Sequence, residues 1–245
     1  MDKKRPLLSV ITVCYRNYNE LVATLDSIPT EAEIELVVVD GGGDEKILNY
    51  LKSAGKVSKW LSEGDNGTYD AMNKGVSLAG GEWVLFLNSG DLFNAKTSDL
   101  VNALREAPDN ISMLAFSVVY DSGVHFSPSR WLKSKMYLHN SLHHQGTCYR
   151  ASLCKSEAFD LRYKIAADYK FNFKALLSGY DVQNANCCLA LCEDGGVSRA
   201  QVWKSFAESS FVKFELLGFK AAPLIIIHFF KLFASLAVSK IRAYV

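Results

Sequence analysis

The stretch EWVLFLNSGDLF, residues 82–93, joins an apolar run to an abrupt polar cluster. Residues 83–87 are apolar at every position, which predicts a strand buried on both faces of a sheet. The tetrapeptide NSGD, residues 88–91, follows directly. Ligands of open α/β sheets bind at the carboxyl ends of the strands. The cluster that ends in Asp91 is therefore a candidate binding site.

The same order of apolar strand, polar turn and helical pattern recurs before this stretch. Strands are expected at 7–14, 34–40, 57–62 and 82–87, with helices near 20–28, 44–52 and 68–79. Such an alternation is typical of a parallel sheet covered by helices on both faces. Further along, the pattern predicts strands at 111–120, 123–127 and 182–192 and a helix at 168–177, with the first two strands forming an antiparallel excursion.

Carboxylates follow three of the four N-terminal strands. In chain order they are Asp40, Glu63, Asp65 and Asp91. Like charges at one sheet edge repel each other, so a bound cation or a set of ligand hydroxyls is a natural reason for them. The alternative is that each acid only caps the helix that follows it.

Composition excludes several classes of protein. The 245 residues are 49% hydrophobic and 22% charged, which is ordinary for a globular chain and excludes wholesale disorder. A net charge of +1 gives no field that would recruit nucleic acid. The six cysteines lack the paired spacing of a zinc site and are expected to be free thiols in a reducing cytoplasm. The N-terminus has no signal-peptide pattern.

Six stretches, found in order, carry a family resemblance. They are SVITVCYRN (9–17), VVVDGGGDEKILNYL (37–51), SEGDNGTYDAMNKGVSLAGGEWVLFLNSGDLF (62–93), HHQGTCYR (143–150), FDLRYKIAADYKFNFKAL (159–176) and GGVS (195–198). Together they resemble the inverting glycosyltransferases of family 2, and the third is typical of small bacterial members that build exopolysaccharide, capsule or O-antigen. The resemblance implies the Rossmann-like α/β fold called GT-A, a mixed but mainly parallel sheet flanked by helices, over residues 1–200. Its nucleotide-sugar half would be about 1–95 and its acceptor half about 96–200, followed by a helical appendage at 201–245.

The resemblance also implies a donor site for a nucleotide sugar at the strand ends. The implied donor residues are Thr12, Val13, Tyr15, Asn17, Asp40, Gly41, Asp65, Asn73, Lys74, Asn88, Ser89 and Gly90. Lys74 has an alternative interpretation as a solvated surface lysine. The family's Asp-x-Asp motif is reduced here to NSGD, which keeps only the last carboxylate. Asp91 is thus the implied ligand of Mn²⁺ or Mg²⁺, an ion that tolerates one protein carboxylate when substrate phosphates supply further oxygens.

An inverting reaction needs a base on the acceptor side. The family places an acid at the start of a helix in the second half, and Asp168 matches that position. The alternative is a helix N-terminal acid favoured only by the dipole. His143, His144 and Gln145 are expected to contact the diphosphate or the acceptor, with packing or hydrogen bonding as the alternative.

The C-terminal segment is apolar and basic. Its run 221–245 is interrupted by Pro223, His228 and Lys231, which argues against a spanning helix. Four basic residues would share one stripe of a continuous helix, unless Pro223 breaks its phase: Lys213, Lys220, Lys231 and Arg242. That pattern suits a helix lying in the headgroup region, so the protein is expected on the inner face of the cytoplasmic membrane. Packing on the domain or in a homodimer is the alternative.

These observations favour a metal-dependent transfer of a hexose from a nucleotide diphosphate sugar, with UDP preferred by family frequency. The acceptor would be a polyprenyl-diphosphate-linked sugar or an oligosaccharide. One rival is a sugar-nucleotidyltransferase, which would need a Gly-rich basic loop where this chain has CYRNYNE, residues 14–20. The other rival is a donor-binding or scaffolding relative that has lost turnover.

Overall fold

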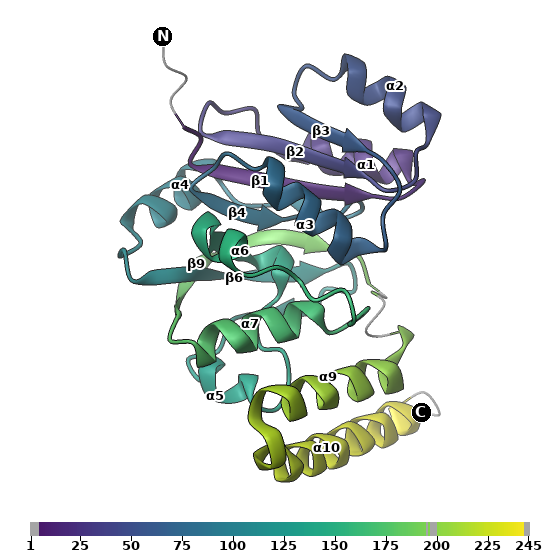
Figure 1. Cartoon of the computed structure of the whole chain (residues 1–245), viewed down its shortest axis with the longest axis vertical. Coiled ribbons are helices and arrows are strands. Elements are labelled where there is room, and N and C mark those ends of the chain that lie inside the picture. Colours follow the sequence, from purple (N-terminus) through teal and green to yellow (C-terminus); the bar gives the residue numbers. More distant parts are fainter. Residues whose placement is uncertain (1–4, 195, 197–199, 243–245) are drawn as a thin grey trace.

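The computed structural model describes residues 5–194, 196 and 200–242 (Figure 1). Its strands are β1 (Leu8–Cys14), β2 (Ile34–Asp40), β3 (Lys59–Ser62), β4 (Trp83–Phe86), β5 (Leu92–Phe93), β6 (Ile111–Tyr120), β7 (His125–Phe126), β8 (Thr147–Arg150) and β9 (Asp181–Cys192). Its helices are α1 (Tyr18–Ser27), α2 (Glu45–Ser53), α3 (Thr68–Leu78), α4 (Thr97–Glu106), α5 (Leu132–Met136), α6 (Ala151–Ser156), α7 (Ala167–Leu177), α9 (Val202–Leu217) and α10 (Ala221–Arg242), with short 3₁₀ turns η1 (His144–Gly146) and η2 (Gly218–Lys220).

The strands form one mixed sheet in the order β3-β2-β1-β4-β8-β6-β9-β5. The first four in this order are parallel, and β8 enters antiparallel between β4 and β6. The expected antiparallel excursion is present, because β7 pairs back on β6. The mainly parallel α/β sheet predicted from the apolar strands is confirmed, although the third strand begins at Lys59 instead of residue 57.

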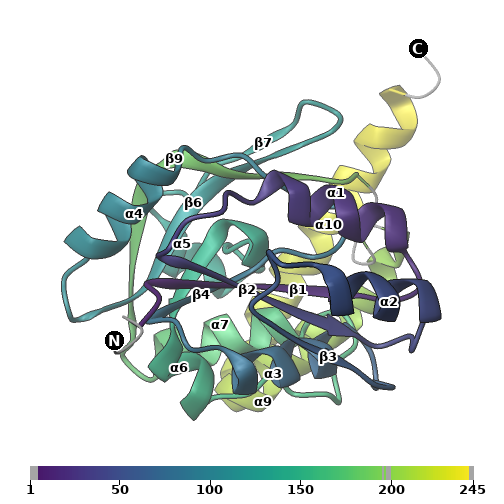
Figure 2. The same ribbon diagram turned by 90° about the horizontal axis from the view of Figure 1, so that it is seen from above.

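Helices cover both faces of this sheet, as Figure 2 shows for α1 and α4 on one side and α3 and α6 on the other. Alternate residues of each central strand enter different cores. In β2, Val37 and Val39 belong to the core that includes residues of α3, α6 and α7, whereas Leu36 and Val38 belong to the core that includes residues of α1, α2 and α4. Every residue of β2 is buried, which explains why its sequence is apolar at nearly every position instead of alternating.

The C-terminal region forms a pair of helices that lie side by side at one end of the molecule, with α9 between α7 and α10 (Figure 1). The chain reverses at η2, where Gly218 has a φ of 60° that favours glycine. The expected continuous basic stripe is therefore wrong. Pro223 lies in the first turn of α10, where proline is tolerated, and Lys213 is fully buried.

This α9–α10 hairpin exposes many apolar side chains. By length and composition alone, the helical stretch Val202–Leu236 could cross a membrane, but the reversal at η2 folds it back on itself. Phe219 at the turn is 89% exposed. Other exposed aromatic residues on the hairpin are Trp203, Phe211, Phe214, Phe229, Phe230 and Phe233.

Candidate active site

The polar cluster after β4 forms a tight turn at the carboxyl edge of the sheet. The Ser89 amide donates to the Val13 carbonyl over 3.1 Å, so the turn stays attached to β1. Gly90 has a φ of 108°, and a Cβ there would lie 2.9 Å from the carboxyl carbon of Glu193. Glycine is favoured here by the backbone conformation, and the Glu193 side chain lies directly beside it.

Asp91 is held inside this turn with little exposure to solvent. It is 6% exposed, and its Oδ2 accepts a hydrogen bond from Gln145 Nε2 over 2.9 Å. Its Oδ1 accepts from the Glu193 amide over 3.3 Å. Burial raises the pKa of Asp91 above its usual value, and the hydrogen bond from Gln145 opposes that rise. This carboxylate is therefore one that a cation would stabilise.

Asp168 lies in the first turn of α7 and receives hydrogen bonds from two separate elements. Asn140 Nδ2 donates to its Oδ2 over 2.9 Å, and the Tyr69 hydroxyl on α3 approaches its Oδ1 at 3.2 Å. These contacts fix the position of the carboxylate, whose side chain is only 15% exposed.

His144 connects the neighbourhoods of the two acids. Its Nδ1 lies 3.4 Å from Asp168 Oδ2, and its Nε2 lies 3.1 Å from Asn88 Nδ2. Because an amide nitrogen only donates, the second contact makes Nε2 an acceptor and places the ring proton on Nδ1, toward Asp168. The adjacent His143 stacks on His144 and contacts the hydroxyl of Tyr120.

These groups line one cavity of about 630 Å³. Seven residues predicted from the sequence lie around it: Asn88, Ser89, Asp91, His143, His144, Gln145 and Asp168. Three of their polar atoms, Asn88 Oδ1, Ser89 Oγ and Gln145 Oε1, are buried without a hydrogen-bond partner among the described residues. Such atoms are costly unless a ligand satisfies them, which marks this wall as a place for a polar ligand.

The other predicted donor residues lie outside the lining of that cavity. Asp40, Gly41 and Asp65 form a separate group at the ends of β2 and β3, where a Cβ on Gly41 would lie 1.6 Å from Asp65 Oδ2. Asp40 is buried and accepts hydrogen bonds from the Gly42 amide and the Ser62 hydroxyl. Thr12 and Val13 are buried in β1.

Four more predicted donor residues lie outside the lining of the cavity, where their side chains bind other parts of the protein or are exposed to solvent. Asn73 exchanges two hydrogen bonds with the backbone of Phe159, and Lys74 contacts Glu63 and the Gly64 carbonyl. Tyr15 is 60% exposed. The Asn17 side chain accepts a hydrogen bond from the Tyr15 amide.

A metal would find oxygen ligands here but no complete protein cage. Among the described residues no group of three or more His, Cys, Asp or Glu side chains could hold an ion. Asp91 with the unpartnered oxygens of Asn88 and Ser89 nevertheless offers a hard, oxygen-only donor set. This set fits Mg²⁺ or Mn²⁺ provided that substrate phosphates complete the coordination.

Sequence reasoning missed several residues of the cavity. Tyr69, Asn140 and Glu193 line it, as does His228 from the C-terminal hairpin. Glu193 follows directly after β9, so the signal used for Asp40 and Asp91, an acid after a strand, would have found it. The other three carry no such signal, because only tertiary packing brings them to the site. Of the predicted GGVS stretch, only Gly196 belongs to the described residues.

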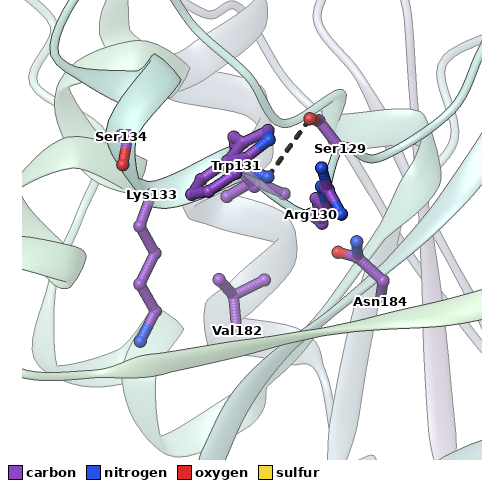
Figure 3. Close-up of a pocket in the computed structure, with 8 residues that line it drawn as sticks. Ser129, Arg130, Trp131, Lys133, Ser134, Val182 and Asn184 are labelled. Atoms are coloured by element: carbon purple, nitrogen blue, oxygen red, sulfur yellow. Dashed lines mark hydrogen bonds between the residues drawn. The ribbon is translucent and has the colours of Figure 1, made fainter.

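A second, smaller pocket of about 260 Å³ lies beside the exposed Trp131 (Figure 3). Arg130 stacks near the Trp131 ring, and Asn184 of β9 faces them across the pocket. Asn184 pairs with Ala115 of β6 and Cys192 pairs with Tyr120, five residues further along β6, so this pocket is about 17 Å from the end of β9 that borders the larger cavity. It contains no residue that the sequence singled out.

Comparison with known protein sequences identifies the family of the chain. Residues 9–161 match the family model described as Glycosyl transferase family 2. An uncharacterized glycosyltransferase of Mycobacterium tuberculosis is 31% identical over 186 residues, which cover 70% of each chain.

Two solved structures share the fold at lower sequence identity. TarS 1–349 of S. aureus, in complex with UDP-GlcNAc, has a TM-score of 0.65 and 20% identity over 91% of this chain and 71% of its own. The mannosyltransferase PcManGT of Pyrobaculum calidifontis, in complex with GDP-Man and Mn²⁺, has a TM-score of 0.62 and 18% identity over 99% and 81%. With the family match over residues 9–161, these findings establish that the chain is a glycosyltransferase and belongs to glycosyl transferase family 2.

Proposed function

We propose that this enzyme transfers a hexose from a nucleotide diphosphate sugar to a lipid-linked glycan with inversion at the anomeric carbon. The observation that carries the proposal is that Asp91 and Asp168 line the same cavity and are connected through Asn88 and His144. One acid is thus available to the leaving group and the other to the attacking group.

Residues of about 1–95 form the nucleotide-sugar half in this proposal. Asp40, Gly41 and Asp65 meet at the ends of β2 and β3, where ligands of parallel sheets bind. We assign them to the nucleoside, with UDP as the preferred nucleotide. The solved relatives bound to UDP-GlcNAc and to GDP-Man support a nucleotide-sugar donor of this kind.

The diphosphate lies near Asp91 in this arrangement. Asn88, Ser89 and Asp91 would hold Mn²⁺ or Mg²⁺, and the bound ion would neutralise the negative charge that develops on the departing diphosphate. Gln145 keeps Asp91 oriented through its 2.9 Å hydrogen bond.

Asp168 acts as the general base of the acceptor half, at about residues 96–200. It takes the proton of the acceptor hydroxyl while that oxygen attacks the anomeric carbon, opposite the bond to the leaving diphosphate. As the new C–O bond forms, the bond to the diphosphate breaks and the configuration inverts. The hydrogen bond from Asn140 and the contact with His144 orient the carboxylate for this step.

A membrane-bound acceptor fits the C-terminal region, residues 201–245. The α9–α10 hairpin exposes aromatic residues, and α10 contains basic residues but no acidic ones. Such a surface suits the anionic headgroup region on the inner face of the cytoplasmic membrane. Absence of binding to anionic liposomes, with all of the protein in the soluble fraction, would contradict this part of the proposal.

Saturation-transfer NMR with UDP-, GDP- and dTDP-sugars, with and without Mn²⁺, tests the donor site. We expect metal-dependent contact with one nucleotide class, lost in Asp91→Asn and kept in the control Asp109→Asn, which changes an exposed acid. If no nucleotide sugar contacts the protein in either condition, the donor site is refuted. The chain would then be a scaffolding relative without turnover.

A further inference from the structure

A buried lysine without a carboxylate partner among the described residues lies behind the catalytic cavity. Lys213 of α9 has no exposed surface, and its Nζ lies 3.0 Å from Nδ1 of His228 on α10. The same Nζ lies 5.4 Å from the centre of the Tyr169 ring on α7. Both acids of α9 are engaged elsewhere, since Glu208 accepts from backbone amides at the start of α7 and Glu215 pairs with Lys170.

An unpaired ammonium in this position is unfavourable. Removing a charge from water costs several kcal/mol in general unless an opposite charge or good hydrogen bonds replace the lost hydration. Burial alone lowers the pKa of Lys213 to about 8, and no carboxylate among the described residues counteracts it. The site is therefore built to gain stability when an anion arrives.

His228 extends the influence of this lysine to the cavity surface. An ammonium group only donates hydrogen bonds, so Nδ1 of His228 accepts and Nε2 carries the ring proton. His228 lines the catalytic cavity together with His139, Ser205 and Ser209. The ring N–H of His228 is a hydrogen-bond donor on this part of the wall, whereas the Ser209 hydroxyl donates to the Phe206 carbonyl of its own helix.

The cluster adjoins the proposed base. Tyr169, which packs against Lys213, follows Asp168 directly, and His139 directly precedes Asn140, the residue that donates to Asp168. Asp91 reaches Asp168 by a different route, through Asn88 and His144. An anion at Lys213 and His228 would thus be distinct from the donor diphosphate at Asp91.

We propose that His228 and His139, which line the cavity, bind the phosphate group of the lipid-linked acceptor and so hold its sugar against Asp168, while the buried charge of Lys213 behind His228 strengthens the attraction. This inference rests on the proposed function, because it assigns the acceptor side of that reaction. It gives the C-terminal hairpin a direct part in acceptor recognition. The reaction that supplies the substrate must then leave a phosphate between the lipid and the acceptor sugar.

Isothermal titration of the full-length protein with geranyl diphosphate, a soluble prenyl diphosphate, tests the site. We expect Lys213→Met and His228→Gln to weaken binding at least tenfold. Lys204→Met, which removes an exposed charge from the same helix, should change affinity less than twofold. Equal affinity of wild type and both site variants would overturn the proposal. Met fills the volume of Lys without the buried charge, and if that variant fails to fold, His228→Gln carries the test.

Three further titrations identify which phosphate the site takes. UDP with Mn²⁺ should bind all variants with equal affinity, and it should not displace geranyl diphosphate. Displacement would place the prenyl diphosphate in the donor site and overturn the inference. Vesicles of phosphatidylglycerol should not compete either, since competition would assign the cluster to bilayer headgroups. Loss of UDP binding by the wild type would refute the proposed function instead, independently of the geranyl diphosphate result.

The pH dependence gives a separate test. The groups that face Lys213 and its partner His228 are Tyr169, His139, Lys135 and Lys231. Only the protonated ammonium attracts the anion, so affinity for geranyl diphosphate should fall as pH rises above about 8. Lys213→Met should remove this fall. A flat wild-type profile between pH 7 and 9.5 would contradict the role of Lys213.

Discussion

Asn140 donates a 2.9 Å hydrogen bond to Asp168 from a segment that the sequence pattern left without a role. Asn140 lies between α5 and η1, whereas Asp168 lies in the first turn of α7. Asn140 also accepts a hydrogen bond from Asn172, one turn further along the same helix. The Asn140 side chain therefore joins the proposed base to the next turn of its helix, and the position of the carboxylate depends on packing between two distant segments.

Substituting Asp168→Asn should abolish transfer while leaving donor binding intact. The amide cannot take a proton from the acceptor hydroxyl, and general-base catalysis contributes roughly 10²–10⁴-fold to rates. Transfer rates and donor affinity should be measured on the same preparation. Asp109→Asn is the control. Retention of more than about a tenth of the wild-type rate would show that another group acts as the base.

Asn140→Ala should lower kcat while the KM for the donor stays near its wild-type value. Hydrogen bonds to charged groups contribute roughly 1.5–3 kcal/mol, which corresponds to a loss of about ten- to hundredfold. Steady-state kinetics with varied donor and varied acceptor separate the two parameters. A rise in donor KM without a change in kcat would show that Asn140 serves the donor site and not the base.

Gly75→Ala should destabilise the protein although alanine favours helices. A Cβ at Gly75 in α3 would lie 2.4 Å from Ile11 Cγ2 in β1, so the helix would have to move away from the sheet. Overpacking of this kind costs about 1–3 kcal/mol, and each kcal/mol lowers Tm by about 2–4 °C at this chain length. Gly55→Ala, which meets nothing within 4 Å, is the matched control for calorimetry. Equal Tm values for the two variants would contradict this packing.

Acid should loosen the α9–α10 hairpin before the sheet unfolds. Glu215 of α9 and Asp160 have pKa values held below their usual range, by contacts with Lys170 and Arg162 respectively. Carboxylates of this kind stabilise the fold above their unfolded pKa, near 4, and lose that contribution as pH falls further. Hydrogen exchange of α9 amides between pH 6 and 3 measures the effect.

The amides of β4 provide the internal reference for that experiment. Glu215→Gln should increase exchange in α9 already at pH 7 and flatten its dependence on pH. Protection of α9 that stays constant down to pH 3 would show that apolar packing alone holds the hairpin.

The strands could be predicted from the sequence because burial on both faces leaves an unambiguous apolar signal. The expected bounds 34–40 and 111–120 coincide with β2 and β6. The structure also explains Gly75 in the YDAMNKG stretch, because α3 approaches β1 too closely there for a side chain. Such local signals are sufficient to predict the strands and helices that surround the site.

The remaining features depend on contacts between distant segments. Lys213 was expected on a basic stripe of one continuous helix because of its spacing from Lys220 and Lys231, but the chain reverses at Gly218 and Lys213 is buried against His228. Tyr69 and Asn140 reach Asp168 from positions 99 and 28 residues away in the chain. No spacing rule connects such pairs before the fold is known.

The family match ends at residue 161, before Asp168 and before every residue of the α9–α10 hairpin. In the proposed assignment the donor half, about residues 1–95, and the acceptor half, about residues 96–200, are consecutive parts of the polypeptide, and Asn73 of the first half contacts the Phe159 backbone of the second. A chimera that keeps residues 1–95 and takes the rest from another family member should retain the donor and exchange the acceptor. Recombination at this one boundary would then create new pairings of donor and acceptor.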